Sequence, residues 1–404
     1  MIDGLLLWLA GDGLAGILAF QVVVLLVVFS NAAVLVRPRR PRPRRPGVSV
    51  ADGGVARPLV SLLVPARNEA ANVGACVRSL LAQTYPRLEV IVLDDRSEDD
   101  TRTVLEAERV RAGDGRLVVL AGEEPPSGWT GKNWACHQLS QAARGDVLLF
   151  ADADTVFGPP DAVDRIVGAL RASRADLLSG LPRQVLGTPG EALLVPLFYW
   201  AFLAFTPLAA HLVWRRAPVA RAVGQLMAFR RAAYDAIGGH EAVRASVVDD
   251  LDLARAVARA GLSCRILDAT DVVACRMYRN GREASAGFAK NLFAAFGYAI
   301  LPYAFVWGFL TYAYLTPIAL LAFHAALPSR VPATPTLLAT VVALALVQWT
   351  FTYARLRLPL WPALAYPLTF VGFLVVAVRS FVAGTLRRAT WKGRAVERPP
   401  TRWI

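Results

Sequence analysis

Two aspartates one residue apart, Asp152 and Asp154, follow directly after a short apolar run at residues 147–151. The turn residues Gly145 and Asp146 precede that run, so it predicts a buried strand that ends at the aspartates. Alternate side chains of a strand point to the same face, and a bend after Asp152 would let both carboxylates reach one cation. An oxygen-only pair suits Mg²⁺ or Mn²⁺, with substrate phosphates completing the coordination shell. Taken alone, however, two aspartates after a strand are more typical of a turn or a helix cap.

The chain from residue 59 to residue 151 alternates between short apolar runs and amphipathic stretches. This pattern predicts a doubly wound, mostly parallel α/β sheet with strands at 59–64, 90–93, 116–120 and 147–151. Ligands bind such sheets outside the carboxyl ends of the strands. Three of these strands end in polar residues: Pro65, Ala66, Arg67, Asn68 and Glu69; Asp94, Asp95, Arg96 and Ser97; and Asp152, Ala153 and Asp154. Acidic groups on one edge repel one another unless cations or hydrogen-bond donors lie between them, which favours a ligand site here.

The composition indicates a protein that is partly embedded in lipid. Of the 404 residues, 55% are hydrophobic and 19% are charged, and the mean hydropathy is +0.42, which is too apolar for a soluble enzyme of this length. The net charge of +13 could indicate nucleic acid or an anionic membrane face. A proline-spaced basic block after an apolar stretch favours the membrane and argues against nucleic acid, because no aromatic residues are interleaved with it to stack on bases. The block contains Arg37, Arg39, Arg40, Arg42, Arg44 and Arg45.

The apolar stretch before this block, residues 14–36, has membrane-spanning length and no small-residue cleavage site, so it predicts a retained anchor. Basic residues next to a span favour the cytoplasmic side. The expected organisation is an anchor (1–36), a basic Pro-rich linker (37–58), a cytoplasmic globular domain (59–291), C-terminal transmembrane segments (292–386) and a basic cytoplasmic tail (387–404). The cysteines, Cys76, Cys136, Cys264 and Cys275, show no CxxC spacing, which is typical of structural thiols in a reducing compartment.

Six motifs in one order carry a resemblance to a known family. They are Pro65-Ala66-Arg67-Asn68-Glu69, Asp94-Asp95-x-Ser97-x-Asp99-x-Thr101, Gly131-Lys132-Asn133, Asp152-x-Asp154, Phe229-Arg230-Arg231 with Gly238-Gly239-His240, and Val248-Asp249-Asp250-x-x-Leu253-Ala254. In this order they resemble the inverting family 2 glycosyltransferases of the GT-A fold, over roughly residues 59–290. Within the family, the sequence is most similar to membrane-bound transferases associated with carotenoids and hopanoids. The expected fold is therefore a GT-A type, doubly wound α/β sheet with transmembrane helices at both ends of the chain.

The resemblance implies a binding site for a nucleotide-sugar donor. Asp152 and Asp154 would hold a divalent metal, Mg²⁺ or Mn²⁺, that bridges the diphosphate, and Lys132 would add a cationic contact to the phosphates. Asp94 or Asp95 would accept hydrogen bonds from the nucleoside. The full set implied for the nucleotide-sugar is Pro65, Ala66, Arg67, Glu69, Asp94, Asp95, Lys132, Asp152, Ala153 and Asp154.

The resemblance also implies a catalytic base, for which Asp250 is the first candidate and Asp249 the second. The family pattern has Glu followed by Asp, whereas this sequence has two aspartates. Adjacent carboxylates raise each other's pKa, which suits proton abstraction. Both residues precede a predicted helix at 251–260, so N-capping would explain them equally well.

On the acceptor and diphosphate side, the resemblance points to Gly238, Gly239, His240, Arg276, Tyr278 and Arg279. Several of these have simpler explanations. Gly238 and Gly239 could end a helix at 231–237, and His240 could be a turn residue. Arg276 and Arg279 could contact either the diphosphate or lipid phosphates. The Gln-x-x-Arg-Trp signature of processive polysaccharide synthases is absent, so single-sugar transfer is expected.

An apolar insert at about residues 191–215 lies between the metal candidates and the base candidates. A single crossing there would place the two on opposite sides of the bilayer, so we expect an interfacial or re-entrant element broken by Pro196 and Pro207, although a buried helix pair fits the same pattern. The apolar segments at 292–327, 337–353 and 360–386 predict three spans, yet three would put the basic tail outside the cytoplasm. Either one segment fails to cross or the first is subdivided.

These inferences lead to one functional prediction. The protein is expected to transfer a single sugar, with inversion, from a nucleotide-diphosphate sugar to a lipophilic acceptor such as a carotenoid or another isoprenoid. The resemblance implies a UDP-sugar as the donor. Its partners would be the nucleotide-sugar donor, the lipid acceptor and a bacterial-type inner membrane, without nucleic acid. The alternatives are a polyprenyl-phosphate acceptor, as in dolichyl-phosphate-mannose synthases, and an inactive membrane scaffold.

Overall fold

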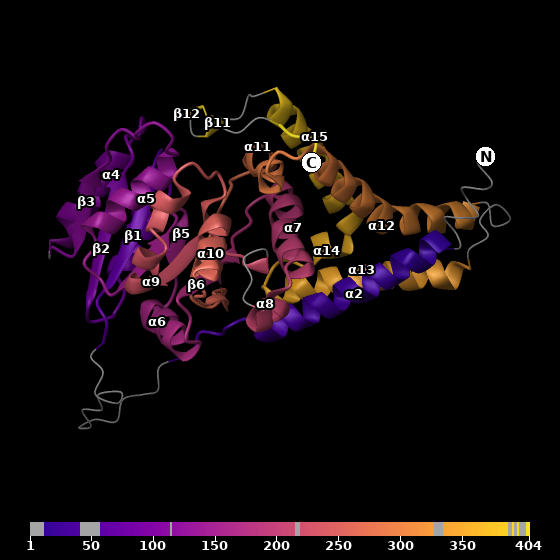
Figure 1. The fold of residues 1–404 in the computed structure, drawn as a ribbon, viewed down its shortest axis with the longest axis horizontal. Helices are drawn as coiled ribbons and strands as arrows, with labels where there is room; N and C mark the ends of the chain where they lie inside the picture. Colours follow the sequence, from indigo (N-terminus) through magenta and orange to yellow (C-terminus); the bar gives the residue numbers. More distant parts are fainter. Residues whose placement is uncertain are drawn as a thin grey trace.

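The computed structural model describes residues 12–40, 57–113, 115–214, 219–326, 334–386, 390–391, 394–395 and 401–404. Its centre is a seven-stranded sheet in the order β3-β2-β1-β4-β8-β6-β9 (Figure 1). The strands are β1 (Val60–Ala66), β2 (Leu88–Asp94), β3 (Leu117–Ala121), β4 (Val147–Ala151), β6 (Leu177–Leu181), β8 (Leu226–Arg230) and β9 (Cys264–Asp268). Only β8 runs antiparallel to its neighbours, so the prediction of a mostly parallel, doubly wound sheet is confirmed.

Helices cover both faces of this sheet, because its central strands are apolar on both sides. One face packs against α3 (Val73–Leu81), α4 (Thr101–Ala112) and α6 (Ala162–Ala172). The other packs against α5 (Gly131–Ala142), α9 (Arg231–Ala236) and α10 (Asp249–Arg259). Each face therefore has its own hydrophobic core, and the polar strand ends are left at the edge between the two layers.

A small second sheet lies at that edge, in the order β5-β10-β7. Its strands are β5 (Thr155–Phe157), β7 (Arg183–Gln184) and β10 (Val273–Cys275). β10 pairs antiparallel with β5, which follows Asp154 directly. The backbone N–H of Arg276 donates to the carbonyl oxygen of Asp154 at 3.2 Å. This pairing brings residues near position 275 next to the aspartates at the end of β4.

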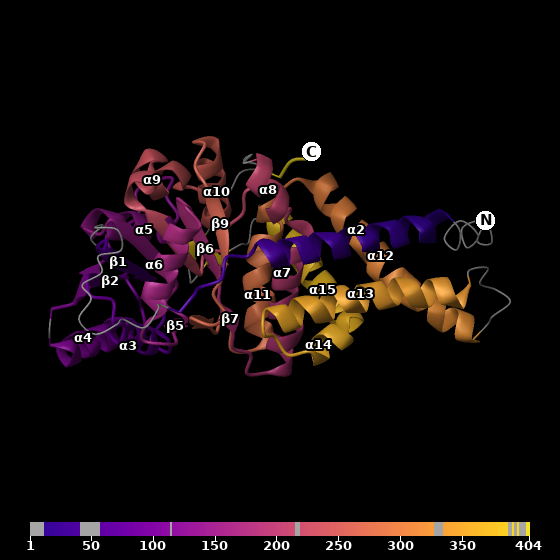
Figure 2. The ribbon, with the colours of Figure 1, turned by 90° about the horizontal axis from the view of Figure 1, so that it is seen from below.

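The remaining helices form an apolar half of the molecule with its own core. They are α2 (Asp12–Val34), α7 (Pro189–Phe205), α8 (Leu208–Trp214), α11 (Gly281–Leu292), α12 (Ile300–Ala326), α13 (Pro335–Arg355), α14 (Trp361–Leu364) and α15 (Tyr366–Thr385), with a short 3-10 turn, η3 (Ala294–Phe296), between α11 and α12. In Figures 1 and 2, α2, α12 and α13 project away from the sheet along the long axis, whereas α7 and α11 lie close to the sheet. Four helical segments are long and apolar enough to cross a membrane: Gly13–Val34, Ile300–Ala326, Pro335–Arg355 and Tyr366–Thr385.

Two direct links tie this apolar half to the edge strand β9. The chain after α2 pairs with β9, because the Val36 N–H donates to the Ile266 carbonyl oxygen and the Asp268 N–H donates back to Val36, both at 2.8 Å. At the end of α13, Arg355 forms an ion pair with Asp268. The ends of α2 and α13 are thereby fixed to the same strand.

One helix boundary differs from the sequence-based expectation, and some residues named in that prediction lie outside the described ranges. The helix expected at 251–260 begins at Asp249, so Asp249 and Asp250 lie in its first turn and do not cap it. The insert expected at 191–215 corresponds to α7 and α8, which pack on α2. Most of the linker, with Arg42, Arg44 and Arg45, lies outside the described residues, as do Arg387, Arg388 and Lys392 of the tail.

Candidate active site

Lys132 lies among the carboxylates of two different strand and helix ends. Its Nζ is 3.0 Å from Asp152 Oδ1. The helix that carries it, α5, begins where the Thr130 hydroxyl accepts a hydrogen bond from the Asn133 N–H. Burial alone would lower the pKa of Lys132, but Asp152 and Asp249 outweigh that effect and raise the pKa well above its usual range. Lys132 is therefore a permanent cation beside both pairs of aspartates.

The segment before α10 is held in place by the neighbouring residue of α5. The buried side-chain amide of Asn133 donates to the carbonyl oxygens of Val243, Arg244 and Ser246, at 2.8, 3.2 and 3.0 Å. The same helix thus supplies the cation and fixes the loop that leads to Asp249 and Asp250.

Asp250 is held by two backbone groups beside Lys132. Its Oδ2 accepts from the Gly224 N–H at 2.9 Å, and its Oδ1 accepts from the Leu251 N–H at 2.7 Å. A Cβ atom on Gly224 would lie 3.4 Å from Lys132 Nζ and 3.5 Å from Asp250 Oδ2, so both groups border this glycine. Burial and then the charge of Asp249 raise the pKa of Asp250 to about 7, although Lys132 and the two backbone N–H groups oppose the rise.

Asp249 is buried, and its Oδ2 has no hydrogen-bond partner within the described part of the chain. This oxygen is an uncommon feature, because buried carboxylate oxygens are nearly always paired. It shows that the environment of Asp249 is not explained by helix capping.

Asp154 lies near two other carboxylates, those of Asp152 and Glu69. Burial, followed by the charges of Asp152 and Glu69, raises the pKa of Asp154 to about 7 against the opposing effects of Cys275 and Lys132. The Cys275 thiol donates to Asp154 Oδ1 at 3.4 Å. No group of three or more metal-ligating side chains occurs among the described residues. The pair of carboxylates nevertheless fits a hard cation whose other ligands are phosphate oxygens, because an added positive charge would relieve their repulsion.

The polar residues after β1 and β2 are tied together by the backbone. Arg67 is buried and donates to the carbonyl oxygens of Asp95 and Arg96, at 2.8 and 2.7 Å. The Asp95 N–H donates to Ala66, the last residue of β1. Asp94 Oδ1 accepts from the Ser97 N–H at 3.2 Å. The side chain of Arg67 therefore shapes the loop, and the carboxylates of Asp94 and Asp95 stand at the end of β2 beside β1.

Two other members of the predicted nucleotide site are apolar and internal. Pro65 is in β1, paired with Leu93 of β2, and Ala153 is buried between the two aspartates. Neither has a polar side chain, so each can contribute only backbone groups and shape to the site.

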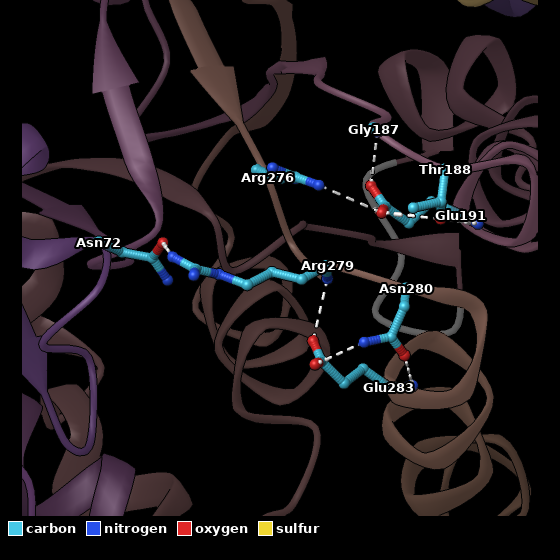
Figure 3. A network of polar contacts seen from close by, with 8 residues as sticks. All are labelled: Asn72, Gly187, Thr188, Glu191, Arg276, Arg279, Asn280 and Glu283. Carbon is cyan, nitrogen blue, oxygen red and sulfur yellow. Dashed lines mark hydrogen bonds and ion pairs between the residues drawn. The ribbon is translucent and has the colours of Figure 1, made fainter.

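A polar network connects Glu69 to the start of α11, and Figure 3 shows the part of it from Asn72 to Glu283. Glu69 Oε2 accepts from the Asn72 side-chain amide at 2.7 Å. The Arg279 guanidinium donates to Asn72 Oδ1 at 2.9 Å, and its backbone N–H donates to Glu283 Oε2 at 2.9 Å. Arg279 thus bridges the loop after β1 and the first turn of α11, and it lies on the same side as the predicted donor site.

A second part of this network connects Arg276 to the start of α7 (Figure 3). Arg276 Nη2 is 3.3 Å from Glu191 Oε1. Glu191 is fully buried, and its carboxylate also accepts from the Gly187 N–H and the Thr188 hydroxyl. Tyr278, between the two arginines in sequence, packs its ring on Phe288 of α11. The segment from Arg276 to Arg279 therefore connects the aspartates after β4 with the apolar half.

Gly238, Gly239 and His240 lie between α9 and α10, and their described contacts are internal ones. Gly238 follows the end of α9 with φ +75°, the left-handed conformation typical of a helix C-terminus. A Cβ on Gly239 would lie 2.5 Å from the Tyr234 ring. His240 is the second residue of a 3-10 turn, η2 (Gly239–Val243), and is fully buried, with its Nδ1 2.7 Å from the Tyr234 hydroxyl. Burial, with Lys132 and His137, lowers the pKa of His240 to about 3. Their contacts are those of core residues.

A buried chain of polar side chains near Asp154 was not predicted from the sequence. Gln225 Nε2 donates to Cys275 Sγ at 3.0 Å, and the Tyr199 hydroxyl donates to Gln225 Oε1 at 2.9 Å. Gln184 Nε2 in turn donates to the Tyr199 hydroxyl at 2.6 Å. Because Tyr199 belongs to α7, the chain joins the apolar insert to the aspartates. These residues come from distant positions, so no local sequence signal could have grouped them.

Comparisons with known proteins show the family of the chain and proteins with a similar fold. The sequence profile described as "Glycosyltransferase like family 2" matches residues 57–293. A 4,4'-diaponeurosporenoate glycosyltransferase of Staphylococcus aureus (strain USA300) is 27% identical over 242 residues, which cover 58% of this chain and 60% of the relative. The chain thus spans about three fifths of the length of that curated relative. A mannosyltransferase from Pyrobaculum calidifontis, solved with GDP-Man and Mn²⁺, has a similar fold with a TM-score of 0.52 at 19% identity, covering 95% of this chain and 99% of that one.

Proposed function

Because the chain belongs to glycosyltransferase family 2, we propose that it transfers one sugar from a nucleotide-diphosphate sugar to a lipophilic acceptor, with inversion at the anomeric carbon. The observation that carries the proposal is the position of Lys132. Its ammonium pairs with Asp152 at the end of β4 and borders the same glycine as the carboxylate of Asp250. A cation for phosphates and a candidate base therefore belong to one site, as a displacement reaction at a sugar diphosphate needs.

In the proposed reaction, the Asp250 carboxylate takes the proton from the acceptor hydroxyl. The acceptor oxygen forms the new bond to the anomeric carbon, the bond to the diphosphate oxygen breaks, and the nucleoside diphosphate leaves. The raised pKa of Asp250, about 7, suits a base that works near neutral pH. Lys132, close to Asp152, would stabilise the negative charge that develops on the departing diphosphate.

The proposed metal ligands are Asp152 and Asp154. A divalent cation, Mg²⁺ or Mn²⁺, would there neutralise charge on the diphosphate. The raised pKa of Asp154, caused first by burial and then by neighbouring carboxylates, supports a site that favours added positive charge. On the nucleoside side we assign Asp94, Asp95 and Glu69, since these carboxylates stand at or after the ends of β1 and β2.

For the acceptor we propose a carotenoid-like or other isoprenoid lipid. The S. aureus relative is named for a carotenoid acid, and the apolar half of this chain reaches the site through α7 and α11. A lipophilic acceptor would reach the site from that half without entering the aqueous phase. The proposal includes a membrane anchor in α2 and a catalytic domain that faces the cytoplasm, the side favoured by Arg37, Arg39 and Arg40.

The test incubates the purified full-length protein with Mn²⁺ or Mg²⁺, a panel of UDP- and GDP-sugars, and a membrane lipid extract. Lipids are then examined by mass spectrometry for a gain of one sugar. The matched variants are Asp250→Asn and Asp152→Asn in the site and Asp235→Asn on the exposed surface of α9. The expected result is a product with the wild type and Asp235→Asn and a loss of about 10³-fold or more with the two site variants.

Each other outcome contradicts a stated part of the proposal. No glycosylated lipid from any donor would overturn the enzymatic proposal and favour a scaffold. A sugar-phospholipid that still forms with Asp250→Asn would indicate a phosphate acceptor, because such an acceptor needs no base. Products of more than one added sugar would contradict single transfer.

A further inference from the structure

The ends of α12 and α13 show how the chain passes through the apolar half. α12 begins just after η3, next to α11, and its first residues pair with the end of the chain: the Ile300 N–H donates to Arg402 and the Leu301 N–H to Trp403, at 2.9 and 3.0 Å. α13 returns to the sheet, because Arg355 pairs with Asp268 and the following Arg357 pairs with Asp271. α12 therefore leads away from the half of the molecule that contains the sheet and the candidate site, here called the catalytic half, and α13 leads back to it.

Both ends of the next long helix, α15, lie near the half of the molecule that contains the sheet. It begins at Tyr366, nine residues after Arg357 and directly after α14, and the ion pair of Arg357 with Asp271 holds the preceding chain to the loop after β9. Near its other end, the Ser380 hydroxyl accepts from the Phe293 N–H at 3.0 Å, and a Cβ on Gly384 would lie 2.3 Å from the Phe293 ring. Phe293 directly follows α11. In both views α15 runs across the long axis, whereas α2 and α13 run along it (Figures 1 and 2).

One face of α15 is an uninterrupted aliphatic stripe. Its members recur at intervals of three and four residues and are each between 45% and 67% exposed: Leu368, Val371, Val375, Val378 and Val382. The opposite face packs on α7, α11 and α12. At the edge of the stripe, Arg379 donates to the Ser285 hydroxyl of α11 at 2.7 Å. The exposed side of α15 is thus apolar and its other side is covered by protein, so the stripe is suited to contact with lipid.

We infer that α15 lies in the plane of the membrane surface, with the aliphatic stripe in the lipid acyl region, and that only α2, α12 and α13 cross the bilayer. Lipid is the occupant that fits the stripe, because α12, which packs on α15, also exposes large apolar side chains near its start, Leu301 and Phe305. The inference rests on the membrane location and not on the reaction proposed above.

This arrangement also accounts for the charges at the two ends of the chain. With three crossings, the arginines after α2 and Arg402 at the chain end stand on the same side as the catalytic half. A fourth crossing would separate them, against the preference of basic residues for one side. It would also need α15 to end at the far end of α2, whereas its end contacts Phe293.

The first test measures sidedness with a membrane-impermeant thiol reagent on sealed vesicles that contain the full-length protein. The native cysteines provide a quiet background, because all four are buried. Single cysteines are introduced as Thr334→Cys before α13, Trp403→Cys at the chain end and Glu123→Cys on the catalytic half, all exposed positions. Trp403→Cys is expected to react from the same side as Glu123→Cys and opposite to Thr334→Cys. Reaction on the side of Thr334→Cys would overturn the inference.

The second test measures depth with a nitroxide label at Leu368→Cys, Val375→Cys or Val382→Cys in lipid nanodiscs. A helix in the surface plane gives three similar, shallow depths by oxygen and nickel-chelate accessibility, whereas a crossing helix gives its greatest depth at Val375→Cys. The control is Val23→Cys, an exposed position in the middle of α2, which is expected to be deep. A depth at Val375→Cys equal to the control, or water exposure of all three labels, would contradict the inference. Neither test needs activity, so its failure is distinct from failure of the proposed reaction.

Discussion

At the scale of single residues, the candidate site is a balance of buried charge. Lys132 is the cation between Asp152 on one side and Asp249 and Asp250 on the other. One aspartate of each pair, Asp154 and Asp250, has a pKa of about 7, and in both cases burial is the largest cause. Such unfavourable burial of acids is typical of sites that bind or react, because a purely structural position would avoid it.

The first prediction concerns the pH dependence of the proposed activity. Asp250 must be ionised to accept a proton, so kcat/KM is expected to rise with pH through about 7. Asp249→Asn should move this apparent pKa down, because Asp249 is the second cause of the rise. A pH profile of both proteins measures it. Asp252→Asn, in the same first turn, is the control, and an unchanged pKa in Asp249→Asn would contradict the assignment.

The second prediction concerns stability. The pKa of Asp154 is raised in the folded state from an ordinary value of 3.8 to about 7, so its ionisation opposes folding. The penalty is absent below about pH 4, grows between pH 4 and 7, and is complete above 7. Asp154→Asn, always neutral, should therefore raise the unfolding free energy at pH 8 by about 1 to 3 kcal/mol and leave it nearly unchanged at pH 4. Thermal unfolding at both pH values measures this, with Asp235→Asn as the surface control.

At the scale of elements, α7 is the connection between the apolar half and the aspartates. It contributes Glu191 to the ion pair with Arg276 and Tyr199 to the buried chain that reaches Asp154 through Gln225 and Cys275. Its far end is held by α2, since the Asn31 side-chain amide donates to the carbonyl oxygen of Leu203 at 2.7 Å. Other helices therefore hold α7 in place, and hydrogen bonds connect α7 to Asp154, one of the proposed metal ligands.

The third prediction tests this connection. Tyr199→Phe removes the hydroxyl that bonds Gln225 and Gln184, and it leaves buried amide groups without that partner. We expect Mn²⁺ affinity to fall roughly 3- to 10-fold, measured directly by the EPR signal of free Mn²⁺ during titration. The matched control is Tyr353→Phe in α13, whose buried hydroxyl has no hydrogen-bond partner within the described part of the chain. Equal Mn²⁺ affinity in the two variants would refute a positioning role for Tyr199.

At the scale of the whole molecule, the sheet and the apolar helices are joined at one edge. β9 receives the chain after α2 through Val36, and its last residue, Asp268, receives Arg355 from the end of α13. Both partners of this ion pair are mostly buried, with 14% and 10% of their side-chain surfaces exposed. These two links hold the sheet in a defined position relative to the ends of α2 and α13.

The fourth prediction measures this joint with a double-mutant cycle on Arg355→Ala and Asp268→Ala. Each single variant leaves a buried charge without its partner and should lower the unfolding free energy by roughly 3 kcal/mol, with a clear coupling energy in the cycle. The neighbouring pair of Arg357 and Asp271 is half-exposed and is the control, with an expected coupling of about 0.2 to 1 kcal/mol. Equal coupling for the two pairs would mean that burial does not strengthen the joint.

The sequence by itself determined the class of the fold and the location of the acidic strand ends. Both follow from local patterns: continuous apolar runs specify buried parallel strands, and the polar residues after them must meet at one edge of the sheet. The order of the motifs indicated the family for the same reason, because each is a short segment with its own turn or helix start. Long apolar stretches in the sequence also predicted the apolar helices, but not the directions in which these helices run.

Only the tertiary structure decided which side chains act together. The pairing of Lys132 with Asp152, and the chain from Tyr199 to Asp154, join residues that are distant in sequence and bring donors to buried acceptors, which no periodicity records. His240 resembled a site residue in its motif, yet its ring is enclosed by Tyr234 and Phe150. The course of α15 was open as well, because an apolar face reports what a helix contacts and not whether it crosses a membrane. The inference about its course rests on the tertiary contacts near its two ends, at Phe293 and Arg357.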